Sequence, residues 1–461
     1  MESISTEFVV STIIFAITFG LIISERIHRT VIAIFGAITM VLYGHFSGFY
    51  SGSDALEAID FNTIGLLMGM MVVVAILETT GAFQYLGILT AKKTKGNPWL
   101  LIVALGTLTS LLSMILDNVT TIILIVPITI IIARMIKISV IPLLIAEAIL
   151  ANVGGVATLV GDPPNIMIAS AANFSFNDFL THSLPTIIFV WFATLLTLRI
   201  IYRKEIKESP QHIDELMKMN EKDAIEDPQT LKIIIVVLVV VVALFFVHHV
   251  IHLQPAMVAL IGAAMALILV VPHKDPQKIF EKVELSVLVF FAALFVIVGG
   301  LEYAGVLKVL ADALTSGAAD NILMTAIIVL WASAVLSAIV DNIPFTVAMI
   351  PVIAYLQTQG VDVNLLWWAL VFGVGLGGNG TPIGSSAGVI VVSKSEQAGH
   401  AISFKEWIRV GGIVMVVGCF VATLGLIAFQ EFLAKPTSSQ IAVEQKAEEA
   451  SEETEGVTTS H

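Results

Sequence analysis

Three carboxylates stand inside segments of the chain that are otherwise apolar, and amide or hydroxyl side chains accompany each of them. Asp117 opens the stretch "DNVTT", Asp341 opens "DNIPFT", and Asp162 lies in "GDPPN". An unpaired ionised carboxylate in lipid costs at least ~2.5–3.5 kcal/mol, so acids at such depth normally bind a cation or exchange a proton. We therefore expect a substrate or coupling-ion site built from Asp117, Asn118, Thr120, Thr158, Asp162, Asn165, Asp341, Asn342, Thr346, Asn379, Thr381, Ser385 and Ser386.

The same residue types also have a structural interpretation, which the sequence leaves open. An Asp or Asn directly before a helix accepts hydrogen bonds from the first free N–H groups of that helix. Asp162 precedes two prolines, and Asp-Pro-Pro is an ordinary way to begin a helix. Both roles are compatible at the two Asp-Asn pairs, with the Asn as cap and the Asp as ligand. A Na⁺ site, where oxygen ligands are preferred, would then use Asp117, Asn118, Asp341 and Asn342.

Other kinds of chemistry are excluded by residues that the chain lacks. There is one cysteine, Cys419, which excludes disulfides, thiolate metal clusters and redox pairs. An intramembrane aspartyl protease would carry Gly-x-Gly-Asp, but residues 159–162 read "LVGD". We therefore expect neither an enzyme nor a cofactor, and we expect H⁺ or Na⁺ as the coupling ion.

The segments that hold these residues have the composition of a membrane protein. Of the 461 residues, 57% are hydrophobic and 13% are charged, and the mean hydropathy is +0.95. Apolar runs long enough to cross a bilayer recur along the chain, which predicts an all-α polytopic membrane protein. We expect full crossings at residues 8–24, 30–48, 62–80, 184–203, 231–250, 255–272, 285–302 and 409–432.

Four further apolar regions are interrupted near their middles. Residues 98–136 and 320–358 are each predicted to form a re-entrant hairpin with an Asp-Asn pair at its tip. Residues 140–172 and 365–393 are each predicted to form a helix broken by "GDPPN" or by "GLGGNGTPIGSS". Broken helix is tolerated at membrane depth only where it is buried in protein or lines a watery cavity. We therefore expect the two tips and the two breaks to converge on one polar site.

The first break should expose backbone groups to that site. Pro163 and Pro164 remove two N–H donors and block the helix behind them. Lipid cannot satisfy the carbonyls that this leaves free. We expect the carbonyls around Gly161 to face a central cavity together with Asp162, Asn165, Thr381, Ser385 and Ser386.

The chain repeats itself at an almost constant offset. At 224 residues, Asp117–Asn118 aligns with Asp341–Asn342, and at 223 residues "GGVATLVG" (154–161) aligns with "GGNGTPIG" (377–384). Each broken helix counts as one crossing, so each half is predicted to have five crossings. Because five is an odd number, the second half must be inserted upside down. The expected parts are a first repeat, a cytoplasmic linker, a second repeat and a disordered acidic tail, at residues 1–203, 204–230, 231–435 and 436–461.

Basic residues indicate the orientation of the crossings. With the N-terminus outside and both hairpins re-entrant, all 23 Lys and Arg residues except Lys308, Lys435 and Lys446 fall on the inside. An excess of Lys and Arg marks cytoplasmic loops. We therefore expect a multi-pass protein of the plasma (inner) membrane with both termini outside.

Together these motifs resemble a known group of transporters. The two Asp-Asn tips, "GDPPN" and "GLGGNGTPIGSS" are similar to the ion transporter superfamily, and closest to its arsenite permeases, NhaD-type sodium–proton antiporters and pigmentation P protein. The resemblance covers about residues 8–432. It implies a scaffold part and a transport part that moves like an elevator, a homodimer in membrane lipid, and a small inorganic ion or oxyanion as substrate. It implies no nucleic-acid partner.

The resemblance leaves several substrates open. Proton-coupled efflux of arsenite or antimonite and sodium–proton exchange are equally favoured. The superfamily's dicarboxylate transporters carry Ser-Asn-Thr at the tips, where this chain has Asp-Asn-Val-Thr (117–120) and Asp-Asn-Ile-Pro (341–344). A sodium-coupled carboxylate symporter is therefore less favoured. An anion channel is also less favoured, because a channel needs no paired titratable acids.

The orientation can be tested by labelling. A cysteine placed in "AKKTKG" (91–96) should react with impermeant thiol reagents only from the cytoplasmic side, because this basic loop is predicted to lie inside. The measurement is labelling of intact cells against inverted membrane vesicles. Labelling in intact cells would exclude the topology.

Overall fold

The protein is entirely helical in the part of the chain that the structure describes. The structure is a computed structural model that describes residues 5–24, 26–270, 275–309, 311–312, 321–441 and 443. Within these ranges, nine helical stretches of at least 18 residues are apolar enough to cross a membrane. The all-α polytopic fold expected from the sequence is therefore confirmed.

Eight helices correspond to the crossings that hydropathy predicts. They are α1 Thr6–Ile23, α2 Arg29–Ser47, α4 Phe61–Glu78, α11 Leu184–Ile201, α13 Pro228–Val247, α14 Pro255–Val270, α16 Leu285–Tyr303 and α23 Ile413–Ala428. Shorter helices connect them: α3 Gly52–Glu57, α5 Ala82–Lys93, α10 Phe176–Asp178, α12 Ile213–Lys218, α15 Pro276–Phe280, α22 Phe404–Trp407 and α24 Gln430–Leu433. Local sequence sets many of the starts. Asp227, for example, caps α13 by accepting the Thr230 N–H at 3.0 Å, and Pro228 follows at the first helical position.

Each of two interrupted regions folds into two helices joined by a short tip. The first hairpin is α6 (Pro98–Ser113) and α7 (Asn118–Met135). The second is α18 (Ile322–Ile339) and α19 (Asn342–Thr358). Asp117 and Asp341 occupy the N-cap positions of the returning helices. The side of the membrane from which each hairpin enters stays a prediction.

The other two interrupted regions are broken helices with matching geometry. α8 (Ile141–Gly155) is followed by α9 (Pro163–Ala172), and α20 (Asn364–Gly377) by α21 (Ser386–Gln397). Asp162 precedes α9 and Ser385 precedes α21, with backbone φ of −146° and −147°. The proline pair therefore begins a helix, where its missing N–H groups need no partner.

The two halves make equivalent close contacts. A Cβ on Gly154 would lie 2.4 Å from the Ser110 carbonyl oxygen, and a Cβ on Gly377 would lie 2.5 Å from that of Ala334. These pairs are related by the offsets of 223 and 224 residues that the sequence shows. Glycine lets two helix backbones approach this closely. The sequence repeat is therefore also a repeat of packing.

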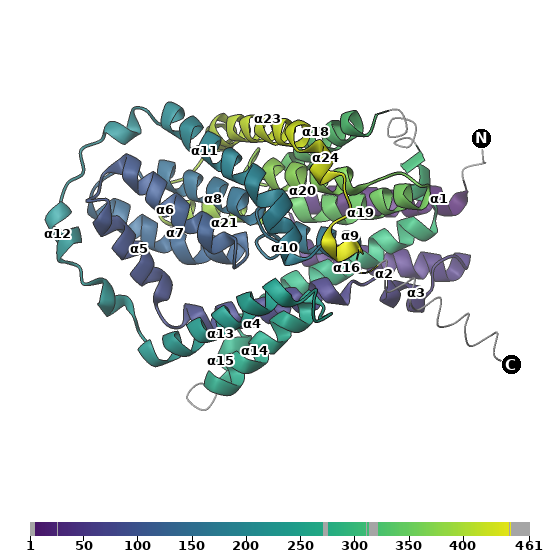
Figure 1. Ribbon diagram of the computed structural model, residues 1–461, viewed down its shortest axis with the longest axis horizontal. Coiled ribbons are helices and arrows are strands. Elements are labelled where there is room, and N and C mark those ends of the chain that lie inside the picture. The colour runs from purple at the N-terminus through teal and green to yellow at the C-terminus, as the bar shows by residue number, and fades with distance from the viewer. Residues whose placement is uncertain are drawn as a thin grey trace.

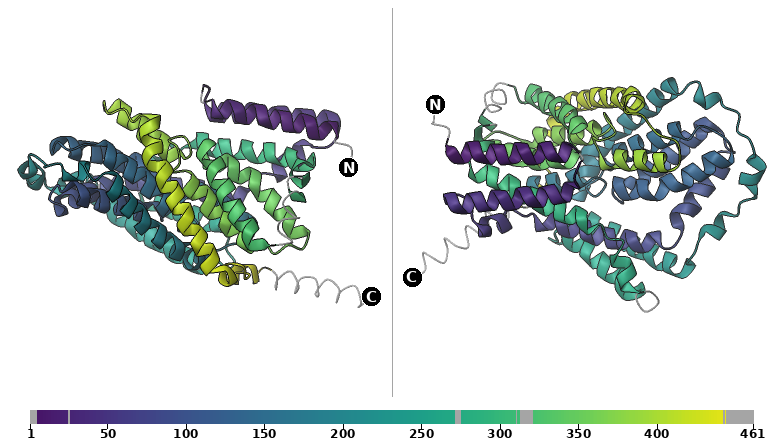
Figure 2. Two further views of the ribbon diagram at one scale, coloured as in Figure 1. Left: turned by 90° about the horizontal axis from the view of Figure 1, so that it is seen from above. Right: turned by 180° about the vertical axis from the view of Figure 1, so that it is seen from behind.

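The two hairpins lie on opposite sides of the centre of the molecule (Figure 1). α6, α7 and α8 occupy one side, and α18, α19 and α20 the other. α9 packs on α19 and α20, whereas α21 packs on α7 and α8, so each half completes the other. This exchange is the arrangement that an inverted repeat produces. α1 and α2 lie side by side along one flank, against α16 (Figure 2).

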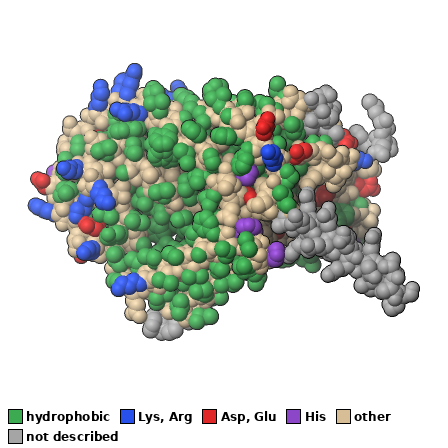
Figure 3. Space-filling model, viewed as in Figure 1, with side chains coloured by type: hydrophobic (Ala, Val, Ile, Leu, Met, Phe, Trp, Pro, Cys, Tyr) green, Lys and Arg blue, Asp and Glu red, His purple; other side chains and the backbone are tan. Residues whose placement is uncertain are grey.

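The linker expected at residues 204–230 is fastened to the helices. The Glu226 N–H donates to the Thr80 carbonyl at 3.0 Å, and Lys92 forms an ion pair with Glu221 at 2.6 Å. The hydrogen bond from Lys92 holds the pKa of Glu221 below its usual value. Lys and Arg side chains gather at the end of the molecule where α5 and α12 lie (Figure 3).

The first residues of the expected acidic tail pack against the helices. Ser439 Oγ donates to Asp178 Oδ2 at 2.6 Å, and Gln440 Nε2 donates to Asn364 Oδ1 at 2.8 Å. Residues 436–441 thus belong to the folded body rather than to the tail. Apart from residue 443, the remainder of the tail lies outside the described residues.

The close approach at Gly154 predicts the cost of a methyl group. Gly154→Ala should lower the free energy of unfolding by about 1–3 kcal/mol, because the new Cβ has no space beside the Ser110 backbone. Gly20→Ala is the matched control, since a Cβ on Gly20 meets nothing within 4 Å. The measurement is the thermal midpoint of each variant in detergent. Equal midpoints for Gly154→Ala and Gly20→Ala would contradict the packing described here.

Candidate functional site

The carboxylate of Asp162 lies where the two hairpin tips meet. Asn342 of the second tip donates from Nδ2 to both carboxylate oxygens at 3.2 Å. Asn118 of the first tip lies beside the same carboxylate, and the charges of Asp117 and Asp341 are close enough to repel it. Asp162 is 1% exposed, so bulk water does not solvate it. The structure thus brings both tips and the first break to one place.

Asn152 of α8 joins the two halves, although it is absent from the residues expected from the sequence. Its Nδ2 donates to Asn379 Oδ1 and to Ser385 Oγ, both at 2.9 Å. Its Oδ1 accepts from Asn118 Nδ2 at 3.0 Å. Asn152 and Glu147 are the only two side chains in α8 that are not apolar, and this contrast could have identified both.

Glu147 is a buried carboxylate apart from the tips. It is 1% exposed, and Thr129 Oγ1 of α7 donates to its Oε1 at 2.6 Å. Its Oε2 has no hydrogen-bond partner among the described residues. Glu147 lies more than one helical turn before Asn152, so the two residues have separate surroundings.

Asp117 acts as a helix cap in this structure. The Thr120 N–H donates to its Oδ1 at 2.8 Å, and the Thr120 hydroxyl donates to its Oδ2 at 2.5 Å. Both carboxylate oxygens are therefore satisfied at the start of α7. The capping interpretation, which the sequence left open, is the one that this geometry shows at the first tip.

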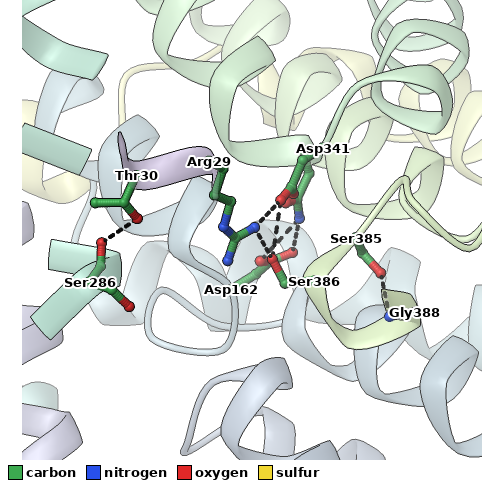
Figure 4. A network of polar contacts seen from close by, with 9 residues as sticks. Arg29, Thr30, Asp162, Ser286, Asp341, Ser385, Ser386 and Gly388 are labelled. Carbon is green, nitrogen blue, oxygen red and sulfur yellow. Dashed lines mark hydrogen bonds and ion pairs between the residues drawn. The ribbon is translucent and has the colours of Figure 1, made fainter. Parts of the chain in front are cut away.

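Asp341 has a charged partner instead. Arg29, at the start of α2, donates from Nη1 to Asp341 Oδ2 at 2.7 Å and to Ser386 Oγ at 2.9 Å (Figure 4). Ser386 Oγ also donates to Asp341 Oδ2 at 3.1 Å. From the sequence, Arg29 only helps to indicate the orientation of the crossings. Its pairing with Asp341 is not visible there, because 312 residues separate the two. No local pattern reveals such a pair.

The threonines of the two breaks fasten the breaks to the hairpins. Thr158 Oγ1 donates to the Met114 carbonyl at 2.6 Å. Thr381 Oγ1 donates to the Ala338 carbonyl, which is the equivalent position in the second half. Both hydroxyls are therefore engaged with protein backbone.

The carbonyls of the first break are satisfied from within. Asn165 Nδ2 donates to the Gly155 carbonyl at 3.0 Å and to the Thr158 carbonyl at 2.8 Å. The expectation of freed carbonyls facing a cavity thus differs from the structure at these two positions, because the asparagine of "GDPPN" reaches back to them. At the second tip, Thr346 Oγ1 likewise donates to the Asn342 carbonyl at 2.8 Å.

Several buried polar atoms of the tips and breaks have no partner among the described residues. These atoms are Asn118 Oδ1, Thr121 Oγ1, Asp341 Oδ1 and Asn379 Nδ2. Because an unpaired buried polar group costs about 1–3 kcal/mol, such atoms in a native protein normally meet water or a ligand. The group offers hydrogen-bond acceptors and a donor in one small region.

A cavity of about 490 Å³ reaches the second tip. Its polar lining comprises His28, Arg29, Glu284, Ser286, Asp341 and Ser386. It opens where α1 ends and where α2 and α16 begin. Asp341 is therefore accessible from this side, whereas Asp162 does not line the cavity.

A second cavity, of about 500 Å³, is related to the first by the repeat. At the 224-residue offset, its Asp60, His252 and Leu253 correspond to Glu284, His28 and Arg29. It opens where α4 and α14 begin, and Asp117 is not among its lining residues. Of these two cavities, only the one beside Arg29 reaches a hairpin-tip acid.

The chain is similar to several transporters along most of its length. It is 37% identical to a 46 kDa membrane protein of Mycobacterium leprae over 92% of the chain and 99% of that protein. It is 39% identical to an uncharacterized transporter of Mycobacterium tuberculosis, over 91% and 97% respectively. The human P protein is 32% identical over 92% of the chain, which spans 60% of that longer protein.

A solved structure has a similar fold. The Alcanivorax borkumensis YdaH transporter, described as having an unusual topology, gives a TM-score of 0.52 at 17% identity, over 81% of this chain and 86% of that one. Residues 19–373 match the citrate transporter family, which is more than half of the chain. The chain is therefore a membrane transporter that belongs to the citrate transporter family.

Proposed function

We propose that the protein is a proton-coupled secondary transporter that exports arsenite or antimonite, and that Asp162 carries the exchanged proton. The observation that carries this proposal is the Asp162 carboxylate, which is buried between two hairpin tips and bonded only to neutral amides. A charge in such a place is costly unless a cation or a proton accompanies it.

The three acids differ in how their charge is compensated, and this difference favours Asp162. Asp117 accepts two hydrogen bonds from Thr120 at the N-terminus of α7. Asp341 is paired with Arg29. Asp162 has neither a cation nor an N-terminal cap bond. Of these three acids, Asp162 is therefore the one whose ionised form is the most costly to bury, so protonation stabilises it the most.

The unpaired atoms near Asp162 suit an uncharged hydroxide. Trivalent arsenic and antimony exist in neutral water largely as neutral hydroxides, whose O–H groups both donate and accept hydrogen bonds. Asn118 Oδ1 could accept such a bond and Asn379 Nδ2 could donate one. The single cysteine, Cys419, is buried, so recognition through three thiolates is excluded.

Sodium–proton exchange is the second candidate. Carboxylate, amide and hydroxyl oxygens around Asp117 and Asp162 are hard ligands, which Na⁺ prefers to nitrogen or sulfur. A carboxylate substrate, as the family's name suggests, is less favoured because only Arg29 offsets the three acids. An anion channel is disfavoured for the same reason.

The proposal includes a location and a movement. We place the protein in the plasma membrane with both termini outside, which the gathering of Lys and Arg at the opposite end supports (Figure 3). The hairpins would be re-entrant, and their tips would move as part of an elevator relative to a homodimeric scaffold. The cavity that reaches Asp341 would then open to the cytoplasm.

The experiment is transport in proteoliposomes under an imposed proton gradient, with arsenite, antimonite, Na⁺, Li⁺ and dicarboxylates supplied in turn. Asp162→Asn should abolish proton-coupled flux while the protein still folds, because a neutral amide is cheaper to bury than a carboxylate. Asp117→Asn and Asp341→Asn should each also abolish coupling. Flux of arsenite that persists in Asp162→Asn with wild-type pH dependence would exclude Asp162 as the carrier.

Glu78→Gln is the matched control for these substitutions. Glu78 is 36% exposed and forms an ion pair with Lys282 at 2.8 Å, far from the tips in the chain. Exposed pairs of this kind contribute about 0–1 kcal/mol, so the substitution should leave flux near the wild-type rate. Flux of Na⁺ against protons without flux of arsenite would select the second candidate.

A further inference from the structure

The contact between Arg29 and Asp341 adds a polar link between two parts of the molecule that also meet where α16 packs on α19. α2 packs on α16, α1 and α3, which form the flank in Figure 2. Asp341 directly precedes α19, and Ser386 is the first residue of α21, so both belong to the hairpin and broken-helix assembly. The Arg29 side chain crosses from the flank to this assembly and bonds to both residues through one nitrogen (Figure 4).

We propose that Arg29 is a tethered cation that occupies the place of the coupling ion at Asp341 and holds the unloaded carrier against the flank. This inference rests on the proposed function, in which the tips move and Asp162 carries the exchanged proton, and it adds Asp341 as a second place where a proton or Na⁺ is loaded. In this proposal, Arg29 prevents the hairpin tips from moving while Asp341 holds neither a proton nor Na⁺.

The geometry makes loading and tethering mutually exclusive. Arg29 Nη1 lies 2.7 Å from Asp341 Oδ2, which is the distance of a charge-assisted hydrogen bond. A cation cannot share that position with a guanidinium, and a protonated carboxylic acid no longer attracts it by charge. Loading of Asp341 therefore frees Arg29.

Other charged groups face the same position and modulate the exchange. Glu284, at the start of α16, and His28, next to Arg29, line the same cavity. Asp162 of α9 and Asp117 of α7 lie on the hairpin side. The Phe290 ring of α16 lies 5.2 Å from the guanidinium carbon, so the flank supports the Arg29 side chain through a cation–π contact. Glu284 offers the freed guanidinium an alternative partner on the flank.

The tether exists on one side of the repeat only. The residue equivalent to Arg29 in the second half is Leu253, at the 224-residue offset. The equivalent of Asp341, which is Asp117, is bonded to Thr120 of its own helix. The first tip is therefore satisfied by a neighbour that moves with it, whereas the second tip depends on a distant element. Only the second tip can sense loading through a contact that breaks.

The test is uncoupled ion flux, which requires no knowledge of the substrate. Wild type, Arg29→Gln, Arg29→Lys and Arg26→Gln are reconstituted in vesicles that contain a pH-sensitive dye, with a membrane potential but no arsenite, antimonite or other solute. Parallel vesicles measure uptake of radiolabelled Na⁺. Arg29→Gln should raise the proton or Na⁺ leak by at least about tenfold, since a charge-assisted contact is lost.

The controls separate tethering from a structural role. Arg26→Gln removes the same charge from an exposed residue three positions away, and it should leak no more than wild type. Arg29→Lys keeps the charge but replaces the planar guanidinium, so its leak should lie between those of wild type and Arg29→Gln. A purely structural role would lower folded yield and coupled flux together without raising the leak.

Two results would overturn the inference. The first is a leak in Arg29→Gln equal to that of Arg26→Gln. The second applies if Arg29→Gln does not reach the membrane, and it is a leak in Arg29→Lys equal to that of wild type. Failure of the proposed function looks different. In that case wild type shows no proton flux when arsenite, antimonite or Na⁺ is added, whatever the leak of the Arg29 variants.

Discussion

The fold depends on one constraint, which is that lipid offers no partner to polar groups at membrane depth, so the protein or what it binds must supply one. Asp162 shows the constraint most clearly, because its carboxylate is held by the Asn342 amide and lies beside Asn118. The two asparagines come from hairpins that lie on opposite sides of the centre (Figure 1). The Asn165 side chain closes the first break by donating to two of its carbonyls.

The repeat provides the framework, and departures from it provide the chemistry. Equivalent glycines and threonines build two matching frames from the two halves. The acid at position 162 is a serine at position 385, and Asn152 has a glycine, Gly375, as its counterpart. A Cβ on Gly375 would lie 2.2 Å from Val156, so an asparagine has no space there. The acid of the break is thus present in the first half only, and packing keeps the asparagine beside it to the same half.

Most of the fold could be predicted from the sequence because hydropathy, proline and glycine act locally. The bounds of the crossings, the two tips and the two breaks all follow from patterns within about 40 residues. The site could be predicted only in part. The Asp-Asn pairs were found because apolar surroundings make them conspicuous, and the same contrast could have identified Asn152 in its apolar helix. Arg29 could not be placed, since a pair 312 residues apart follows from tertiary packing alone.

The charges of the site determine which ligands the proposed loading would favour. Asp117 is stabilised by its own helix, Asp341 by Arg29, and Asp162 by neutral amides only. With Asp162 protonated and the tether in place, the region keeps a single net negative charge. A neutral hydroxide can enter such a region, and a small cation is attracted to it. A multiply charged anion is repelled unless Arg29 is freed, and freeing Arg29 requires that Asp341 be neutralised first. In the proposed mechanism, the order of binding would follow from which acid is least compensated, and thus from the contacts of three aspartates rather than from the shape of a pocket.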